Sequence, residues 1–558
     1  MKDVEAELSK LFGAGAPFES NIENVLGVDL EVFKNRPHNL REILLRSKQF
    51  AERDYLVYED RRITFGQHFQ QVASLAKALE EQYGVKPGDR IGLVARNLPE
   101  WATTFWAATS LGAVVTALNA WWAPDELEYA LEHSEPRVLI GDSQRLALVA
   151  NYAPELPRIN LETEFAKLYE YAPDAELPTI GIEEDQPALM LFTSGTTGRS
   201  KAAVLSHRSV IGFVQVQQAT AAERNIRSSV ANPNAHLQTA FLCGAPLFHA
   251  STLCGGLVMM LASGAKLVFR TGRFDPKQVL GLIEKEKITN LSTMGSMAPL
   301  LIDELNRDDY DMSCVSAVIL GGAPVSPIVA ARLRKVFPTA YKLNQVRMGY
   351  GLTESAALAA GIEGADLIRY PTSTGKANKH TEIQIWDDHG NVLPAGEQGH
   401  IMVRHAYLML EYWRNPEATA KTLRPGRWLD TGDFGYLNDE DFLFIDSRAR
   451  DMILRAAENV YPLEIEYRLD EHPAVDESAV VGVDHDILGQ EVKAFVVPRP
   501  NCTIDTDELA AWVGEKLANF KVPSLWRVLE QPLPRNPTGK ILKEELLNPG
   551  NSRFLQER

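Results

Sequence analysis

The sequence is poor in the features that mark secreted, disulfide-bonded and membrane-spanning proteins. Only four cysteines occur in 558 residues, and none belongs to a Cys-x-x-Cys pair: Cys243, Cys254, Cys314 and Cys502. This spacing excludes a disulfide framework and a cysteine-rich zinc site, and it fits a reducing compartment. No apolar run has the length of a membrane span, and the N-terminus is too acidic for a signal peptide. We therefore expect a cytoplasmic protein without an integral membrane segment.

Basic residues are outnumbered by acidic ones, 57 against 74. The formal net charge is −17, which argues against nucleic acid or an anionic membrane as the main partner. Any polyanionic ligand must then be held by a few local cations, not by the overall field. The hydrophobic content of 45% is that of a folded globular protein, and the length allows more than one domain.

Neither common nucleotide-binding motif is present. The Gly-Lys-Ser/Thr ending of a Walker loop is missing, and Gly349-Tyr-Gly351 continues as Leu-Thr-Glu, unlike a dinucleotide fingerprint. The chain has instead Thr193-Ser-Gly-Thr-Thr-Gly-Arg-Ser-Lys201, directly after the apolar run Ala188–Phe192 of a predicted buried strand. Backbone N–H groups at the glycines, the hydroxyls and the two cations can surround phosphate oxygens. The alternative is a polar surface turn, because these residue types are common in turns.

Apolar runs and amphipathic segments alternate along the first half of the chain. Strand-like runs cover Arg90–Ala95, Ala113–Ala117 and Arg137–Ile140, with a helix predicted near Glu126–Glu132. This alternation predicts an α/β fold of doubly wound parallel sheets. Residues 1–50 are expected to be helical and polar. The pair Trp121-Trp122 predicts buried packing or a subunit contact.

The pattern changes twice in the second half. From Ile383 onward, short β segments with tight turns predict a β-rich subdomain. After Asp446 the chain reads as a small α+β unit, long enough to fold as a separate, mobile domain. We predict a large N-terminal domain of residues 1–449 and a small C-terminal domain of residues 450–558, with a hinge near Arg450.

The stretch Thr193–Lys201 resembles the phosphate loop of the adenylate-forming enzymes, the superfamily of acyl-CoA synthetases, firefly luciferases and peptide-synthetase adenylation domains. Six further stretches resemble motifs of this superfamily and follow in its order: Pro246–His249, Gly321–Pro324, Gly349–Glu354, Asp430–Asp433, Ser447–Asp451 and Asn536–Lys540. The resemblance extends from about Tyr55 to the C-terminus. It implies two reactions, joining of a carboxylic acid to AMP and transfer of the acyl group to coenzyme A.

The resemblance also implies roles for individual residues. Nucleotide-binding residues would be Thr193, Ser194, Gly195, Thr196, Thr197, Gly198 and Lys201 at the phosphates, then Gly321, Gly322, Ala323, Pro324, Gly349, Tyr350, Gly351, Leu352 and Thr353 around the adenine. Asp433 would accept bonds from the ribose hydroxyls, and Arg448 would reach ribose or phosphate. Thr193 and Glu354 would hold Mg²⁺, a hard cation that prefers oxygen ligands.

Two further residues have proposed catalytic roles by the same resemblance. Lys540 would stabilise the charge that builds on the α-phosphate as the carboxylate attacks. His249, in a segment that gates the acyl pocket, either orients the carboxylate or is a packed, hydrogen-bonded histidine. The sequence leaves both interpretations open.

The chain departs from the superfamily pattern in two loops. Ser200-Lys201-Ala202 replaces Pro-Lys-Gly, and the alanine is harmless if its φ is negative. Ala456-Ala457 replaces a Gly-Gly pair that lies close to the pantetheine of coenzyme A, so the added methyl groups put the acceptor in question.

The substrate and partners can be narrowed from the predicted pocket walls. Residues 210–219, 242–261, 294–300 and 356–361 are mostly apolar, and the run 242–261 contains no acidic residue that could hold an amino group. We expect a hydrophobic carboxylic acid, medium or long in chain or bearing a ring, together with ATP, Mg²⁺ and coenzyme A. Alternatives are a non-CoA acceptor, such as a carrier protein or internal hydroxyl, a luciferase-like oxygenase, or a silent nucleotide-binding protein. A homodimer stays open.

Overall fold

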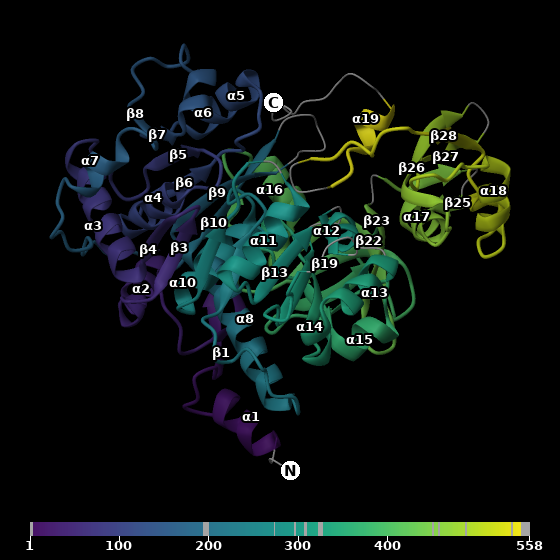
Figure 1. Ribbon diagram of the computed structural model, residues 1–558, viewed down its shortest axis with the longest axis horizontal. Helices are drawn as coiled ribbons and strands as arrows, with labels where there is room; N and C mark the ends of the chain where they lie inside the picture. The colour runs from purple at the N-terminus through teal and green to yellow at the C-terminus, as the bar shows by residue number, and fades with distance from the viewer. Residues whose placement is uncertain are drawn as a thin grey trace.

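The computed structural model describes residues 4–193, 200–272, 274–294, 297–305, 310–321, 327–448, 451–455, 458–485, 488–536 and 540–547. Figure 1 shows a large body formed by the first four fifths of the chain and a smaller lobe beside it, formed by the C-terminal part. This is the predicted α/β fold with a large N-terminal and a small C-terminal domain. Residues 449 and 450 lie outside the described residues, so the predicted boundary and hinge stay predictions.

The first sheet is mainly parallel. Its described strands, in spatial order, are β20 (Glu411–Tyr412), β10 (Lys201–Ser206), β9 (Pro187–Thr193), β6 (Val114–Ala117), β5 (Arg90–Val94), β7 (Val138–Gly141) and β8 (Arg158–Asn160). Strands β9, β6, β5, β7 and β8 run parallel, whereas β10 and β20 are antiparallel to their neighbours. The predicted strand-and-helix alternation is confirmed here, with α5 (Pro124–Ser134) between β6 and β7.

The second sheet has a parallel and an antiparallel half. The parallel half is β15 (Val346–Tyr350), β14 (Ala317–Gly321), β13 (Asn290–Met294), β11 (Ala240–Cys243), β12 (Lys266–Phe269) and β3 (Asp54–Tyr58), edged by β4 (Arg61–Thr64). The antiparallel half is β16 (Ala360–Glu363), β17 (Ser373–Ala377), β23 (Leu443–Arg448), β22 (Trp428–Leu437), β21 (Leu423–Arg424), β19 (Gly399–Arg404) and β18 (Glu382–Trp386). The antiparallel half is the predicted β-rich subdomain.

Helices cover both faces of the parallel strands, because these strands are apolar on both sides. Besides α5, the described α-helices between β4 and β23 are α3 (Phe65–Glu81), α4 (Pro99–Ser110), α6 (Ser143–Leu148), α7 (Phe165–Tyr169), α8 (His207–Arg227), α9 (Ala250–Thr252), α10 (Met259–Ala262), α11 (Pro276–Glu286), α12 (Met297–Leu305), α13 (Pro327–Val336), α14 (Pro338–Lys342), α15 (Gly364–Arg369) and α16 (Pro416–Thr422). One hydrophobic core contains side chains of both sheets together with α3, α4 and α8. These helices therefore pack between the two sheets.

Helix α8 begins directly after β10, and its first half is buried. The Ser206 hydroxyl caps it by accepting a hydrogen bond from Ser209 N at 3.1 Å. Almost every residue from His207 to Val216 is buried. Strand β10, which directly precedes α8, is thus attached to the core of the protein.

The N-terminal segment differs from the prediction. Helices cover only α1 (Val4–Phe12) and α2 (Leu40–Arg46), whereas β1 (Ser20–Val25) and β2 (Val28–Phe33) form an antiparallel hairpin. The expectation of a helical segment over residues 1–50 was wrong. Leu26 and Gly27 both have positive φ, 52° and 89°, as a two-residue hairpin turn requires.

The small domain has its own sheet and core. Its strands are β25 (Glu458–Val460), β24 (Ile453–Arg455), β27 (Gly489–Pro498), β26 (Val475–His485) and β28 (Leu525–Val528), with helices α17 (Pro462–Asp470), α18 (Thr506–Gly514) and α19 (Lys543–Leu547). Two hydrophobic clusters lie on the two faces of this sheet. The predicted α+β unit is confirmed, and the Asp505 side chain caps α18 by accepting hydrogen bonds from Asp507 N and Glu508 N.

No helix within the described ranges combines the length and the apolar content needed to cross a membrane. Cys243, Cys254 and Cys314 are buried free thiols, and Cys502 is an exposed one.

Candidate active site

The predicted phosphate loop is anchored by a β-hairpin. Strands β9 and β10 pair antiparallel, with Thr193 opposite Lys201, and the Thr193 hydroxyl donates to the Lys201 carbonyl at 3.4 Å. Residues 194–199, which include the predicted site residues Ser194, Gly195, Thr196, Thr197 and Gly198, lie outside the described residues. Ala202 is buried and does not have positive φ, so the exchange of glycine for alanine adds no strain there.

Three side chains meet beside Lys201, the first residue of β10. The Tyr412 hydroxyl donates a hydrogen bond to Glu354 Oε1 at 2.6 Å, and Lys201 Nζ lies 4.0 Å from the centroid of the Tyr412 ring. Burial lowers the pKa of Lys201, while the charge of Glu354 opposes this shift. Lys201 and Glu354, two predicted site residues, are therefore brought together around a tyrosine that the sequence did not single out.

Glu354 lies in a short 3₁₀ turn, η3 (Thr353–Ser355), just after β15. The next two residues, Ala356 and Ala357, have left-handed φ values of 51° and 63°. Gly351 is needed at the start of this turn, because a Cβ there would lie 2.5 Å from the Ala357 carbonyl carbon. Such strained backbone is found at positions that must present a side chain in a fixed direction.

A second tyrosine–carboxylate pair lies on the predicted ribose side. The Tyr350 hydroxyl donates to Asp433 Oδ2 at 2.6 Å, and Asp433 is 5% exposed. Tyr350 ends β15, while Asp433 lies in β22 opposite Arg448 of β23. The structure thus brings three predicted residues from separate motifs to one place.

The predicted adenine turn follows β14, whose last residue is Gly321. Gly322, Ala323 and Pro324 lie outside the described residues. Strands β14 and β15 are parallel neighbours, so Gly321 and Tyr350 leave the sheet at the same edge. Ligands of open α/β sheets bind at this carboxyl edge.

His249 lies among aromatic rings. Its ring centroid is 4.7 Å from that of Phe248, which is packed edge-on against Trp121 at 4.9 Å. The Nε2 atom of His249 is buried and has no hydrogen-bond partner among the described residues, and burial lowers its pKa to about 4. The imidazole is therefore neutral at pH 7. Trp122 packs on Phe192, so the tryptophan pair contributes to the interior.

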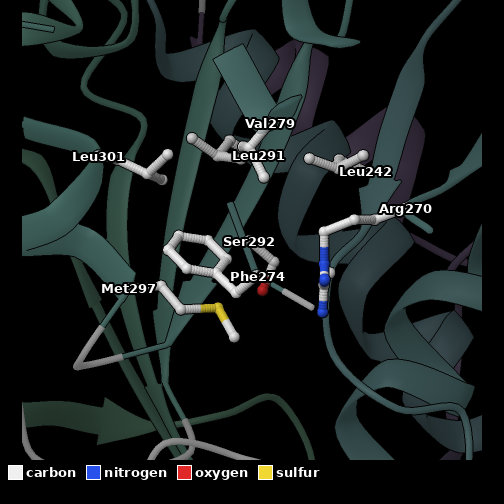
Figure 2. Close-up of a pocket in the computed structure, with 9 residues that line it drawn as sticks. Leu242, Arg270, Phe274, Val279, Leu291, Ser292, Met297 and Leu301 are labelled. Carbon is white, nitrogen blue, oxygen red and sulfur yellow. The ribbon is translucent and has the colours of Figure 1, made fainter. Parts of the chain in front are cut away.

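A small cavity opens near the carboxyl ends of β11, β12 and β13. Its nine lining residues are mostly apolar: Leu242, Gly244, Arg270, Phe274, Val279, Leu291, Ser292, Met297 and Leu301. Figure 2 shows the Arg270 guanidinium on one side and Leu301 and Met297 across from it. The volume of about 10 Å³ has room for one water at most. Leu242, Gly244 and Met297 belong to the predicted pocket walls.

Lys540 lies on the small domain. It is bonded twice to Asn536, because Asn536 N donates to the Lys540 carbonyl and Lys540 N donates to Asn536 Oδ1, both at 2.9 Å. The flanking residues are tied to β26 and α17, because Arg535 pairs with Glu477 at 3.4 Å and Lys543 with Glu466 at 2.7 Å. The lysine is therefore part of the small domain.

Oxygen ligands for Mg²⁺ are present where the resemblance implies them. Glu354 supplies a carboxylate, and Thr193 supplies a hydroxyl opposite Lys201. Among the described residues there is no cluster of three or more His, Cys, Asp or Glu side chains that could hold a metal alone. Proteins commonly hold Mg²⁺ by one or two side chains together with nucleotide phosphates.

The family comparison covers most of the chain. Residues 45–413 match the model of the AMP-binding enzymes, and residues 464–540 match that of the AMP-binding enzyme C-terminal domain. A feruloyl-CoA synthase of Amycolatopsis sp is 32% identical over 489 residues, which cover 87% of this chain and 93% of that protein. The acyl-CoA ligase sidI of Aspergillus fumigatus is 30% identical over 549 residues, covering 91% and 90%.

Solved structures show the same fold. An o-succinylbenzoate CoA synthetase of Bacillus subtilis, in complex with its acyl-adenylate intermediate, superposes with a TM-score of 0.76 at 28% identity, covering 92% of this chain and 98% of that chain. An anthranilate CoA ligase in complex with anthranoyl-AMP superposes with a TM-score of 0.81 at 25% identity, covering 91% and 96%. The chain therefore belongs to the AMP-binding enzyme family, in the adenylate-forming superfamily, and is an AMP-forming acyl-CoA synthetase that uses ATP, Mg²⁺ and coenzyme A.

Proposed function

We propose that this acyl-CoA synthetase activates a hydrophobic carboxylic acid that bears a ring, with a medium or long alkyl chain as the second candidate. The acid oxygen attacks the α-phosphorus of ATP, and pyrophosphate leaves with the bridging oxygen. The coenzyme A thiol then loses its proton, its sulfur attacks the acyl carbon, and AMP leaves. The meeting of Lys201, Tyr412 and Glu354 beside the phosphate-loop hairpin carries the adenylation step. The rings beside His249 carry the choice of acid.

On the phosphate side, Lys201 and the Thr193 hydroxyl bind the ATP phosphates. Two anions meet in the first reaction, so positive charge near the phosphates lowers its barrier. Glu354 and Thr193 would hold Mg²⁺, which supplies such charge when bound. The partly buried ammonium of Lys201 is suited to this role, because burial strengthens its attraction to phosphate oxygens.

On the nucleoside side, Asp433 accepts hydrogen bonds from the ribose hydroxyls, and the Tyr350 ring faces the adenine. A carboxylate has about four acceptor positions. Asp433 can therefore keep the hydrogen bond from Tyr350 and still accept both ribose hydroxyls. Arg448 pairs with Asp433 across strands β22 and β23, and it would reach the ribose or a phosphate.

At the acid, His249 acts as a neutral hydrogen-bonding group. Its pKa of about 4 means that it brings no charge at pH 7, but its buried Nε2 is available to hold the carboxylate of the substrate. This favours the orienting role over the packed histidine. The neighbouring rings of Phe248 and Trp121 favour a ring-bearing acid, because aromatic rings pack well edge to face.

On the small domain, Lys540 approaches the α-phosphate for the first reaction and withdraws for the second. Rotation about the predicted hinge near Arg450 exchanges the two arrangements. We place the boundary between residues 1–449 and 450–558. A cytoplasmic location fits the four free thiols.

The test is pyrophosphate release across a panel of acids, with and without coenzyme A. We expect release with ring-bearing acids such as ferulate, weaker release with octanoate, and none with a short dicarboxylate such as malonate. Thioester should form with each acid that supports release. Preference for malonate would contradict the apolar pocket, and release without any thioester would contradict transfer to coenzyme A.

A further inference from the structure

We propose that Tyr412 is a positioning residue that holds Glu354 and Lys201 in the geometry that binds MgATP. This inference deepens the proposed function, since it depends on Glu354 as the metal ligand and on Lys201 as a phosphate ligand. Tyr412 itself touches neither substrate in the proposal. It acts through the two charged groups on either side of it.

The first observation is the hydrogen bond to Glu354. The oxygen–oxygen distance of 2.6 Å lies in the range of a hydroxyl bound to an ionised carboxylate, which is stronger than a neutral hydrogen bond. The donor and acceptor residues are 3% and 9% exposed, so water competes little for either group. The bond occupies Oε1 and thereby fixes the plane in which the carboxylate presents its other oxygen.

The second observation is the contact with Lys201. The ammonium lies 4.0 Å from the ring centroid, well inside the range of a cation–π contact. A lysine has many rotamers, and fixing one of them before ATP arrives reduces the entropy lost on binding. The Tyr412 ring can therefore hold the ammonium near the phosphate loop in the absence of nucleotide.

The third observation is that the Tyr412 backbone is fixed from several directions. In β20, Tyr412 pairs with Ala203 of β10, and its N–H donates to the Thr419 hydroxyl of α16 at 2.9 Å. Three residues earlier, Met409 N donates to the Glu354 carbonyl at 2.8 Å. The segment that carries Tyr412 is thus bonded both to the strand after the phosphate loop and to the turn of Glu354.

These contacts connect the two sheets. Lys201 and Tyr412 belong to the first sheet, whereas Glu354 follows β15 of the second. A single side chain therefore sets the relative position of the phosphate ligand on one sheet and the predicted metal ligand on the other. Loss of the hydroxyl alone should affect the metal side, and loss of the whole ring should affect both sides.

The experiment measures ATP binding by equilibrium dialysis over a range of Mg²⁺ concentrations and in EDTA, without any carboxylic acid. Tyr412→Phe should raise the Mg²⁺ concentration for half-maximal binding about tenfold, as expected for one charge-assisted hydrogen bond, and leave binding in EDTA unchanged. Tyr412→Leu should also weaken binding in EDTA about threefold, because it removes the cation–π contact.

Two further variants separate positioning from mere stability. Glu354→Gln removes the carboxylate charge, and adding Tyr412→Phe to it should cost no further Mg²⁺ affinity if the tyrosine acts through Glu354. Tyr370→Phe is the matched control, because the Tyr370 hydroxyl donates to Glu440 at 2.8 Å on the exposed surface. We expect it to bind MgATP like the unaltered chain.

The outcomes distinguish the inference from the function on which it depends. If the unaltered chain binds no MgATP, or if Glu354→Gln leaves the Mg²⁺ dependence unchanged, the proposed roles fail and the inference fails with them. If Glu354→Gln shifts the dependence and Tyr412→Phe does not, only the inference is overturned. Equal losses in EDTA and in Mg²⁺ for Tyr412→Phe would also overturn it, because they indicate a structural defect.

Discussion

The predicted site residues are held in two different ways in the two domains. In the large domain, Glu354 and Asp433 are buried carboxylates, each fixed by a tyrosine hydroxyl at 2.6 Å. In the small domain, Lys540 is partly exposed, and the residues on either side of it are tied to strand β26 and helix α17 by two ion pairs. The large domain therefore preorganises the nucleotide side, whereas the small domain carries its lysine as part of a body with a separate core.

The described contacts between the two domains include a ring stack and the approach of two carboxylates. Tyr461 of the small domain stacks on Phe434 with ring centroids 6.0 Å apart. Asp446 accepts a hydrogen bond from Gln398 at 3.0 Å and faces Glu464, which pairs with Lys521 at 2.8 Å. A contact with charged groups suits the domain rotation that we propose. This difference predicts that substitutions at the large-domain site weaken ATP binding. It also predicts that substitutions at the small-domain site impair one half-reaction more than the other.

The largest effect is expected for Lys540→Ala. Acyl-adenylate formation should fall by about a hundredfold or more, since loss of one transition-state donor costs about 3–4 kcal/mol. Thioester formation from pre-made acyl-AMP should persist, because the small domain has by then turned. Both half-reactions are measured separately, by pyrophosphate release and by thioester yield.

Lys516→Ala is the matched control, since this lysine also lies on the small domain and pairs with Glu471 at 3.1 Å on the surface. It should leave both half-reactions unchanged. An equal loss of both reactions in Lys540→Ala would show that Lys540 is structural, or that the domain does not turn.

A smaller effect, on binding, is expected for Asp433→Asn. Loss of charge-assisted bonds to the ribose should raise the KM for ATP about thirtyfold. The preference for ATP over 2′-deoxyATP should narrow in the same variant. Glu440→Gln, at the tyrosine–carboxylate pair on the surface, is the control and should change neither quantity. An unaltered preference in Asp433→Asn would mean that this carboxylate does not contact the ribose.

A pH effect is expected at the domain interface. Burial and then the charge of Glu464 raise the pKa of Asp446 from 3.8 to about 7, against the hydrogen bond from Gln398 and the charge of Lys521. A raised pKa in the docked arrangement favours docking fully below pH 4, and this contribution is lost as the pH rises to about 7. Because the carboxyl is only half-buried, we expect a change of at most about tenfold in the docking equilibrium.

The measurement is fluorescence energy transfer between labels on the two domains from pH 4.5 to 8. Asp446→Asn should flatten the pH dependence, whereas Asp439→Asn, on the exposed neighbouring turn, should not. A pH profile that Asp446→Asn leaves intact would place the responsible group elsewhere.

The smallest effect is expected for Ala456→Gly and Ala457→Gly. Both residues lie outside the described residues, so this prediction comes from the sequence. If the backbone of this loop lies further from the pantetheine than in relatives, the glycine variants remove only the contacts of the methyl groups and make the loop backbone less stiff. Adenylation should be unchanged, and the KM for coenzyme A should change by no more than about threefold, by the same conformational-entropy argument. A large gain in thioester formation would show that the methyl groups obstruct the channel.

The N-terminal segment shows where local pattern was insufficient. Polar composition suggested a helix. Val25, Val32 and Phe33 are buried, however, and they hold a hairpin against the rest of the large domain. The turn at Leu26-Gly27 was the available signal, since its glycine can adopt positive φ at low cost. The buried Arg36, which bonds Glu184 at 2.6 Å from 148 residues away, had no local signal.

Some residues of the site could likewise be predicted from the sequence, and others could not. The motif residues Glu354, Lys201 and Asp433 could be named in advance, because each lies in a short stretch whose residue types and order are distinctive. Tyr412 could not, since nothing in its neighbourhood separates it from other aromatic residues in apolar strands. Only pairing of β20 with β10 places its ring on Lys201 and its hydroxyl on Glu354.

The sequence by itself determined the α/β class, the two-domain organisation and the chemistry of the family, because periodicity and motif order are properties of neighbouring residues. The tertiary structure decided which carboxylate meets which hydroxyl, and that the imidazole of His249 is neutral. Those properties depend on burial and on contacts between distant segments, which fix the local dielectric and the hydrogen-bond partners. Burial and contacts between distant segments cannot be read from any one stretch of the chain.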